Sequence, residues 1–301
     1  MVARGGIGSR LYDLLIYLFL ILFCLSILYP FGYMAANSVS DYRQVGLEKV
    51  QVMPKGFHLG AYEIIVSAYN IRQAYWNSTR YTAVGTLLTL AVCSLAGYSL
   101  SKRRLVGRTF YIILFTITMF FTGGLIPTYL NILKLGLFDS IWAIVLPGAF
   151  NFWYIIILRT NIQQIPNDLI ESAHMDGASD WFVYLRIVLP LSQAILATVA
   201  IWRMVAVWNE FFAPLLYLNS EEKMPLTIIL RRILITQEEN VDGVQADHGA
   251  DPLAMDWIVF LGLRKATNMA AVLLTIGPII LTYPFFQKYF VRGILIGSLK
   301  G

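Results

Sequence analysis

Long apolar stretches recur along this chain, and they constrain its fold more than any other feature of the sequence. A helix needs about 20 mostly apolar residues to cross the hydrocarbon core of a membrane. The stretches therefore predict an all-α integral membrane protein, with a single transmembrane domain over residues 1–301 and six spans. The spans are expected at about 11–35, 78–101, 109–131, 139–160, 191–217 and 267–290.

Composition supports this prediction and excludes other classes of protein. Charged residues make up 14% of the chain, whereas soluble domains carry about 25%, so most of the chain is expected in lipid. Cys24 and Cys93 both fall inside apolar runs, which argues against a disulfide or a cysteine-based metal site. The basic residues form no stripe with interleaved aromatics, so we expect no nucleic-acid partner.

The short loops indicate which side of the membrane each polar segment faces. The loop SKRRLVGR at 101–108 holds four basic residues, and the opposite short loop holds Lys134. Because cytoplasmic loops are enriched in Lys and Arg, both termini and residues 161–190 are expected on the cytoplasmic side of the inner (plasma) membrane. The long outer loops, 36–77 and 218–266, carry charges of both signs and follow the rule less closely.

A polar segment at 165–190 separates the fourth and fifth apolar stretches. Pro166 and the residues after it are typical of a helix start, since proline is tolerated in the first turn. Gly177 is expected to break this helix because glycine adopts a positive φ without strain. Ser179 or Asp180 can cap a second helix. The segment is therefore predicted to form two short helices with a sharp corner at Gly177.

The charge of this segment favours a soluble partner over the membrane surface. It holds four acidic residues, and Arg186 is its single Lys or Arg residue. Helices that rest on the anionic inner leaflet are usually rich in Lys and Arg, so an amphipathic hairpin on the membrane is the less favoured alternative. A rigid corner that continues into two spans can transmit a displacement from a soluble partner into the membrane.

The pattern in this segment resembles the EAA loop of the permease subunits of ATP-binding-cassette (ABC) importers. Ser172 and Tyr184 depart slightly from that family's consensus. The resemblance implies the type I ABC importer permease fold, with cytoplasmic coupling helices that dock an ATPase. The residues that carry the pattern are Glu171, Ala173, Asp176, Gly177, Ala178 and Pro190.

The resemblance also implies the partners. They are a sister permease subunit, two copies of a cytoplasmic ABC ATPase, an extracytoplasmic solute-binding protein, the substrate and the surrounding lipid. The chain is expected to be a non-catalytic subunit without a cofactor of its own, with ATP and Mg²⁺ on the ATPase; no P-loop motif occurs in it. The tail, residues 291–301, would run along the ATPase through Gly297, Ser298 and Lys300.

Other runs resemble the carbohydrate importers of the maltose type. WNEFFAPLLY at 208–217 is similar to that subgroup, and FTGGLIPTYL at 121–130 to the branch that serves oligosaccharides and polysaccharide fragments. Arg203 lies near the middle of a predicted span, and Arg231 and Arg232 are expected outside the membrane. These arginines favour an acidic saccharide such as alginate as the substrate. A neutral oligosaccharide fits nearly as well.

Polar residues inside the spans are candidates for the transport path, because such residues are costly in lipid and are usually functional. Arg203 and Glu210 lie about two helical turns apart and so share a face. They either line the path or form a structural pair that ties helices together. The candidates for the path are Asn151, Trp153, Arg203, Asn209 and Glu210.

Two other classes of protein fit the sequence less well than the importer. An ion-driven carrier or channel would leave the polar segment at 165–190 unexplained. An intramembrane enzyme would need a polar constellation at depth, but His58, His174 and His248 all fall in loops. The acidic stretch 238–256 fits a solvated loop, with a Ca²⁺ site as the alternative, although its spacing does not match an EF-hand.

Overall fold

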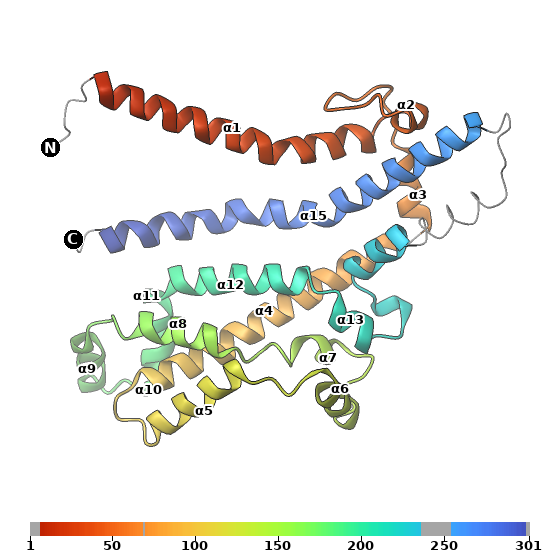
Figure 1. The fold of residues 1–301 in the computed structure, drawn as a ribbon. Coiled ribbons are helices and arrows are strands. Elements are labelled where there is room, and N and C mark those ends of the chain that lie inside the picture. Colours follow the sequence, from red (N-terminus) through yellow and green to blue (C-terminus); the bar gives the residue numbers. More distant parts are fainter. Residues whose placement is uncertain (1–6, 69, 236–253, 299–301) are drawn as a thin grey trace. The chain divides into compact units, whose positions relative to one another are not determined.

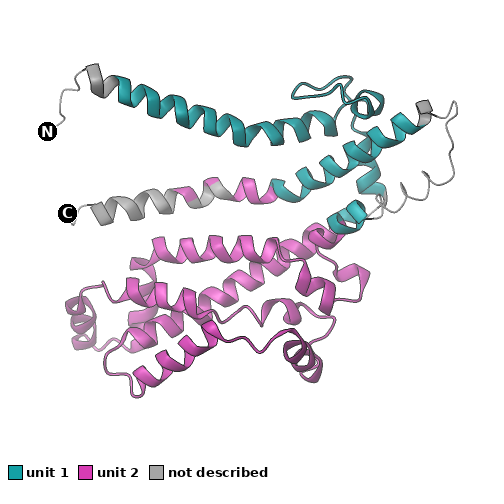
Figure 2. Ribbon diagram, in the orientation of Figure 1, with its two compact units in different colours: residues 1–71, 230–277 teal, residues 72–229, 278–301 magenta. Residues whose placement is uncertain are grey.

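The structure is a computed structural model that describes residues 7–68, 70–235 and 254–298. These residues form helices and connecting loops, and the described part of the chain contains no β-strand. The chain divides into two compact units (Figure 2). Unit 1 comprises residues 1–71 and 230–277, and unit 2 comprises residues 72–229 and 278–301.

Unit 1 is built around two long apolar helices (Figure 1). The first, α1, exposes its apolar side chains from Leu11 to Tyr29, which suits a helix whose sides contact lipid. The second, α15, begins in unit 1 and includes Pro278 and Pro284 further along. The elements named in this unit are α1 (Ile7–Ser38), α2 (Tyr42–Gly46), α3 (Gly60–Ala68) and the first part of α15 (Ala254–Ser298).

The backbones of α2 and α15 touch where two glycines meet. A Cβ atom on Gly262 would lie 1.7 Å from the carbonyl oxygen of Tyr42, and one on Gly46 would lie 2.0 Å from the carbonyl oxygen of Ile258. Neither position has room for a side chain. Asp41 fixes the start of α2, because its carboxylate accepts hydrogen bonds from two backbone N–H groups of that helix.

This crossing predicts that Gly262→Ala destabilises the protein. The added methyl group would meet backbone atoms that cannot move aside, and overpacking of this kind costs about 1–3 kcal/mol. Gly277→Ala is the matched control in the same helix, since its Cβ would meet nothing within 4 Å. We expect the apparent Tm of the detergent-solubilised chain to fall by about 5 °C for Gly262→Ala alone, measured by circular dichroism. Equal Tm values for the two variants would contradict this packing.

Unit 2 holds the remaining helices around a core formed chiefly by α4, α8 and α12. Cys93 and Leu100 of α4 are buried against Phe152, Ile155 and other side chains of α8, and Val199 of α12 completes the cluster. The helices before the acidic segment are α4 (Ile71–Ser101), α5 (Arg108–Phe120), α6 (Leu125–Lys134), α7 (Ile141–Val145) and α8 (Phe152–Ile162). Those after it include α12 (Gln193–Trp208) and α13 (Phe212–Tyr217).

Several of the predicted spans are broken helices. The span expected at 109–131 consists of α5 and α6, which are bent by 114° at a break where Gly124 has a φ of 83°. The span expected at 139–160 consists of the short helix α7 and the 11-residue helix α8. Among the described residues, three helices are long and apolar enough to cross a membrane, or up to five spans if each bent pair is one. The number six stays a prediction.

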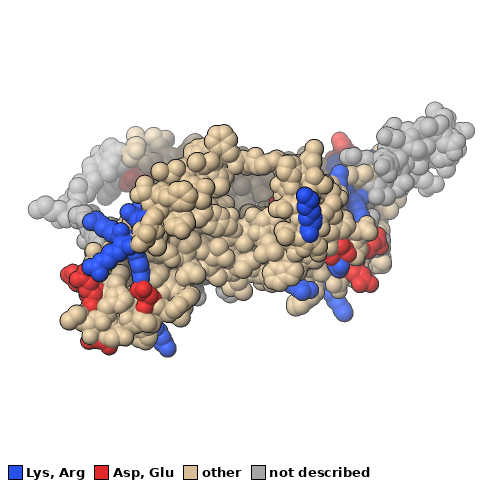
Figure 3. Space-filling view, turned by 90° about the horizontal axis from the view of Figure 1, so that it is seen from below, with Lys and Arg blue, Asp and Glu red and all other residues tan. Residues whose placement is uncertain are grey.

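Charged side chains gather at two ends of the face drawn in Figure 3, and the surface between them is made of other residues. Within unit 2, Asp139 joins two loops, the one before α7 and the one after α13. Its carboxylate accepts hydrogen bonds from the backbone N–H groups of Asn219 and Ser220 and from Lys223 Nζ, at 2.7 Å for the lysine. The bonds from Lys223 and Ser220 hold the pKa of Asp139 far below its usual range.

Candidate functional site

The acidic corner, residues 165–183, lies at one end of unit 2, where charged side chains gather (Figures 1 and 3). It consists of α9 (Asn167–Met175), a turn at Gly177 and α10 (Asp180–Val183). Ser179 caps α10, since its hydroxyl accepts a hydrogen bond from the N–H of Phe182. The two helices and the break between them lie where the sequence predicts them.

The turn at Gly177 is closed by two backbone hydrogen bonds. The N–H of Ala178 donates to the carbonyl of Ala173 at 2.9 Å, and the N–H of Gly177 donates to the carbonyl of His174 at 3.0 Å. This pair of bonds is the Schellman motif, which ends a helix with a residue of positive φ, and Gly177 has a φ of 82°. The spacing of alanine, glycine and alanine in the sequence is therefore the spacing of one helix cap.

The residues of the pattern divide between the inside and the outside of the corner. Ala173 and Ala178 are partly buried and pack against a cluster that includes Tyr98 and Tyr184. Glu171 and Asp176 are exposed. A small side chain is needed where α9 lies on the cluster, and the two carboxylates remain available to another molecule.

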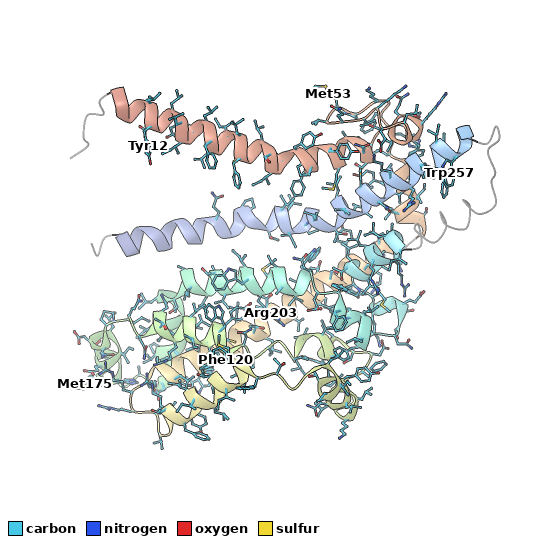
Figure 4. The ribbon with its side chains drawn as sticks, in the orientation of Figure 1. Tyr12, Met53, Phe120, Met175, Arg203 and Trp257 are labelled. Carbon is cyan, nitrogen blue, oxygen red and sulfur yellow. The ribbon has the colours of Figure 1, made fainter. Side chains whose placement is uncertain are left out.

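Gly177 is required for its backbone conformation and not for lack of space. A Cβ atom at this position would have no heavy atom within 4 Å, so the outer side of the turn is open. Met175, at the end of α9, is 88% exposed and stands at the tip of the corner (Figure 4). An open, convex tip with acidic sides is suited to insertion into a recess of a partner protein.

A charged contact ties the acidic corner to the loop that follows α4. Lys102 pairs with the carboxylate of Asp180, and its ammonium group lies 4.5 Å from the centre of the Tyr98 ring. His174 Nε2 lies 3.7 Å from the same carboxylate. The hydrogen bond from Lys102 holds the pKa of Asp180 below its usual range. The basic loop was interpreted from sequence as a topology signal alone, and its contact with the corner was missed.

The corner continues without interruption toward the membrane-spanning part. After α10 the chain forms a turn of π-helix, η1 (Tyr184–Val188), and the short helix α11 (Leu189–Leu191), which contains Pro190. The Tyr184 hydroxyl is hydrogen-bonded to that of Ser94 on α4 at 2.6 Å. The segment from α10 to α11 then bends by 79° into α12. A movement of the corner would thus reach both α4 and α12.

Arg203 projects from the middle of α12 and lies against the chain between α7 and α8 (Figure 4). A Cβ atom on Gly148 would lie 2.4 Å from Arg203 Nη2, so the guanidinium rests directly on this glycine. Arg203 Nε is buried and has no hydrogen-bond partner in the described part of the chain. The arginine is therefore held by packing while part of its hydrogen-bonding capacity is unused.

Arg203 and Glu210 are not joined as a structural pair. Glu210 Oε1 accepts hydrogen bonds from the N–H groups of Phe212 and Ala213, at 3.0 and 3.1 Å, and so caps the start of α13. No ion pair between Glu210 and Arg203 occurs among the described residues. Asn209 is exposed and ends α12.

The two candidates on α8 lie at its start. Asn151 accepts a hydrogen bond from the N–H of Tyr154 and caps the helix, while Trp153 is 52% exposed. Tyr154 stacks with Trp202 of α12, with ring centres 6.3 Å apart. Because α8 and α12 pack together, Arg203 and the start of α8 belong to one region, whereas Asn209 and Glu210 lie at the end of α12.

The remaining predictions fall near or beyond the edge of the described chain. Gly297 and Ser298 form the last residues of α15, and Lys300 lies outside the described residues. Most of the acidic stretch 238–256 also lies outside them. Among the described residues, no group of three His, Cys, Asp or Glu side chains is placed to hold a metal ion.

Apolar, partly broken helices together with an exposed acidic corner are the features expected of a membrane protein with a polar surface outside the lipid. Residues 90–296 match the family described as the binding-protein-dependent transport system inner membrane component. The chain belongs to this family of transport permeases. The resemblance to ABC importer permeases, and with it the all-α permease fold, is confirmed.

Relatives and a solved structure agree with this family. The chain is 38% identical to the polygalacturonan/rhamnogalacturonan transport system permease protein YtcP of Bacillus subtilis, over 97% of this chain and 99% of the relative. It is 36% identical to protein LplC of the same organism, over 90% and 89%. A bacterial ABC transporter involved in the import of the acidic polysaccharide alginate has a chain of the same fold. It gives a TM-score of 0.81 at 28% identity and covers 96% of this chain and 100% of the other.

The contact between Lys102 and Asp180 predicts a measurable effect on the acidic corner. Lys102→Ala should make local unfolding of α9 and α10 more frequent, because it removes an exposed ion pair. Such a pair contributes up to about 1 kcal/mol, which corresponds to roughly a fivefold change in the equilibrium constant for local unfolding. The charge-swapped variant, Lys102→Asp with Asp180→Lys, should restore most of the protection. Hydrogen exchange of the amides of α9 and α10 measures the opening.

Arg104→Ala is the matched control for this experiment, because it removes a basic residue from the same loop that is exposed and outside this contact. Equal exchange rates in the Lys102→Ala and Arg104→Ala variants would show that the ion pair does not hold the corner.

Proposed function

We propose that this chain is one of the two permease subunits of an ABC importer for oligosaccharides or polysaccharide fragments. A solute-binding protein would deliver the saccharide from outside, and alternating access would pass it through the permease pair into the cytoplasm. The observation that carries the proposal is the acidic corner, an exposed helix cap with alanines inside and carboxylates outside, in a chain of this family. An ion-driven carrier has no use for such a corner.

The acidic corner would dock one of two ATPase subunits in the cytoplasm. Glu171 and Asp176 would pair with basic residues in a recess of the ATPase, and Gly177 would form the tip that enters it. Closure of the ATPase dimer would push the corner, and the continuous segment through η1 would carry the displacement to α12. ATP and Mg²⁺ would be bound by the ATPase. The tail, with Gly297, Ser298 and Lys300, would add a second contact.

The orientation follows from this docking. The acidic corner and the basic loop at 101–108 lie at one end of unit 2, so an ATPase at the corner places both in the cytoplasm. With an even number of spans, both termini would lie there too, which agrees with the rule for basic loops. The sister permease, with a corner of its own, would engage the second ATPase copy.

The proposed substrate class is an acidic saccharide. Arg203 would offer its guanidinium to carboxylates of the passing chain, because the planar fork of arginine fits a carboxylate with two parallel bonds. Exposed tryptophans in the same region, Trp153 and Trp202, offer rings on which sugar faces can stack. Two proteins similar to this chain are named for uronate-containing polysaccharides, polygalacturonan and alginate.

The coupling proposal predicts that Gly177→Trp and Glu171→Lys abolish substrate-stimulated ATP hydrolysis. The tryptophan would point into open space and block docking, and the lysine would repel basic residues on the ATPase. Gly177→Ala is the control: it carries the same positive-φ strain, about 1–2 kcal/mol, with little added bulk. Hydrolysis is measured in the complex reconstituted in lipid. Wild-type stimulation in the Gly177→Trp complex would contradict the docking role.

The substrate proposal predicts a selective defect for Arg203→Lys. Lysine keeps the charge but loses the planar fork, so uptake of oligogalacturonate should fall about tenfold, which corresponds to one lost charge-assisted hydrogen bond. Uptake is measured in proteoliposomes with the binding protein present. Basal ATP hydrolysis should remain, because Arg203 lies far from the corner along α12. An equal loss for a neutral oligosaccharide of the same length would contradict a role in carboxylate binding.

A further inference from the structure

Unit 1 contains a pocket of about 300 Å³ between α2 and the first part of α15. This volume is at the lower end of the range for small-ligand sites, about 300–1,000 Å³. The pocket opens beside Glu48, whose side chain is 80% exposed, and Lys265 lies deeper, with 28% of its side chain exposed. The residues that line it are Val45, Gly46, Glu48, Leu261, Arg264, Lys265 and Asn268.

The basic residues of this pocket lie inside a segment that is otherwise apolar enough to cross a membrane. That segment is Trp257–Thr282, and Arg264 and Lys265 stand about 11–12 Å along the helix from its first residue. Charged residues at such a position are costly and usually functional. Their presence calls for a polar partner or a ligand at this point of α15.

The two cations differ in what they contact. Lys265 Nζ is 3.3 Å from a carboxylate oxygen of Glu48 and lies 5.6 Å from the centre of the Tyr33 ring. Arg264 is partly buried and makes no hydrogen bond or ion pair with any described residue. Asn268 Oδ1 is buried and likewise has no hydrogen-bond partner in the described chain. The pocket is thus lined by Arg264 and by Asn268, whose guanidinium and buried amide oxygen have no hydrogen-bond partner among the described residues.

Arg264 and Asn268 stand four residues apart and share one face of α15, with about 6 Å between them along the axis. The guanidinium can only donate hydrogen bonds, and it matches the two oxygens of a carboxylate. The amide oxygen can only accept, so it requires a donor such as a hydroxyl group. Together they select a molecule that carries a carboxylate and hydroxyl groups within one sugar ring.

We propose that this pocket is a binding subsite for one uronate residue of the substrate, separate from the path residues on α12. Arg264 binds the carboxylate, and Asn268 accepts a hydrogen bond from a ring hydroxyl. The two positive charges of Arg264 and Lys265 and the negative charge of Glu48 give the pocket a net charge of one positive unit. This net charge matches a single carboxylate. The assignment of a uronate to this subsite rests on the proposed function, which supplies the class of substrate.

The test is equilibrium dialysis of labelled digalacturonate against the assembled transporter in nanodiscs without ATP. Arg264→Gln removes the cation, and Asn268→Leu removes the acceptor at similar volume. Each should weaken binding at this subsite at least about tenfold, as the loss of one buried or charge-assisted hydrogen bond implies. Arg43→Gln is the matched control, because Arg43 is exposed on α2 and does not line the pocket.

Further measurements distinguish binding at the subsite from binding at Arg203 and from nonspecific binding of anions. In the Arg203→Lys background, digalacturonate binding that is sensitive to Arg264→Gln should persist. A neutral disaccharide should not compete, and inorganic phosphate should compete poorly, because it offers no array of ring hydroxyls. Arg264→Lys, which keeps the charge in α15, should fold as wild type and still bind digalacturonate more weakly.

Three results would overturn the subsite. They are unchanged digalacturonate binding in Arg264→Gln and Asn268→Leu, competition by phosphate as strong as by digalacturonate itself, and an equal loss in Arg43→Gln. Uptake by the wild-type transporter separates the two proposals. If oligogalacturonate is transported while Arg264→Gln binds it normally, the subsite is wrong and the proposed function stands. If wild type transports no acidic saccharide, the proposed substrate class itself fails.

Discussion

The need to bond every backbone group inside the membrane is the constraint on which this fold depends. Continuous helices such as α1 and α4 meet it within themselves. The break between α7 and α8 does not, because it frees the carbonyls of the residues before α8. Side chains of α4 bond to two of them: Thr89 Oγ1 donates to Gly148 O at 3.3 Å, and Cys93 Sγ donates to Ala149 O at 3.5 Å. The broken segment is thereby hydrogen-bonded to α4.

The same constraint explains where Arg203 lies. Its guanidinium rests on Gly148, where the absence of a side chain leaves room for it, and the polar backbone of the break provides a local environment that a continuous apolar helix would lack. A broken helix inside a transport protein is tolerated where it lines a cavity or is buried in protein. Under the proposed function, the break and the arginine are two parts of one feature: polar backbone and a guanidinium whose Nε has no hydrogen-bond partner among the described residues, placed where a polar substrate would pass.

The sequence predicted the features that depend on local physics. Apolar runs predicted the helices. Gly177 predicted the corner, because a helix cap with a positive φ depends on only a few consecutive residues. Contacts between distant segments could not be read in this way. Asp180 meets Lys102 across 78 positions, and no periodicity links them.

Glu210 shows why spacing alone misleads. Seven residues separate it from Arg203, which in an unbroken helix would place the two charges on one face. However, α12 ends at Trp208, and Glu210 instead bonds to the first N–H groups of α13. The consequence fits the proposed function. A permanent salt bridge on Arg203 would have to break for each carboxylate of a passing acidic saccharide. An arginine that forms no ion pair with a described residue can instead exchange one transient carboxylate for the next.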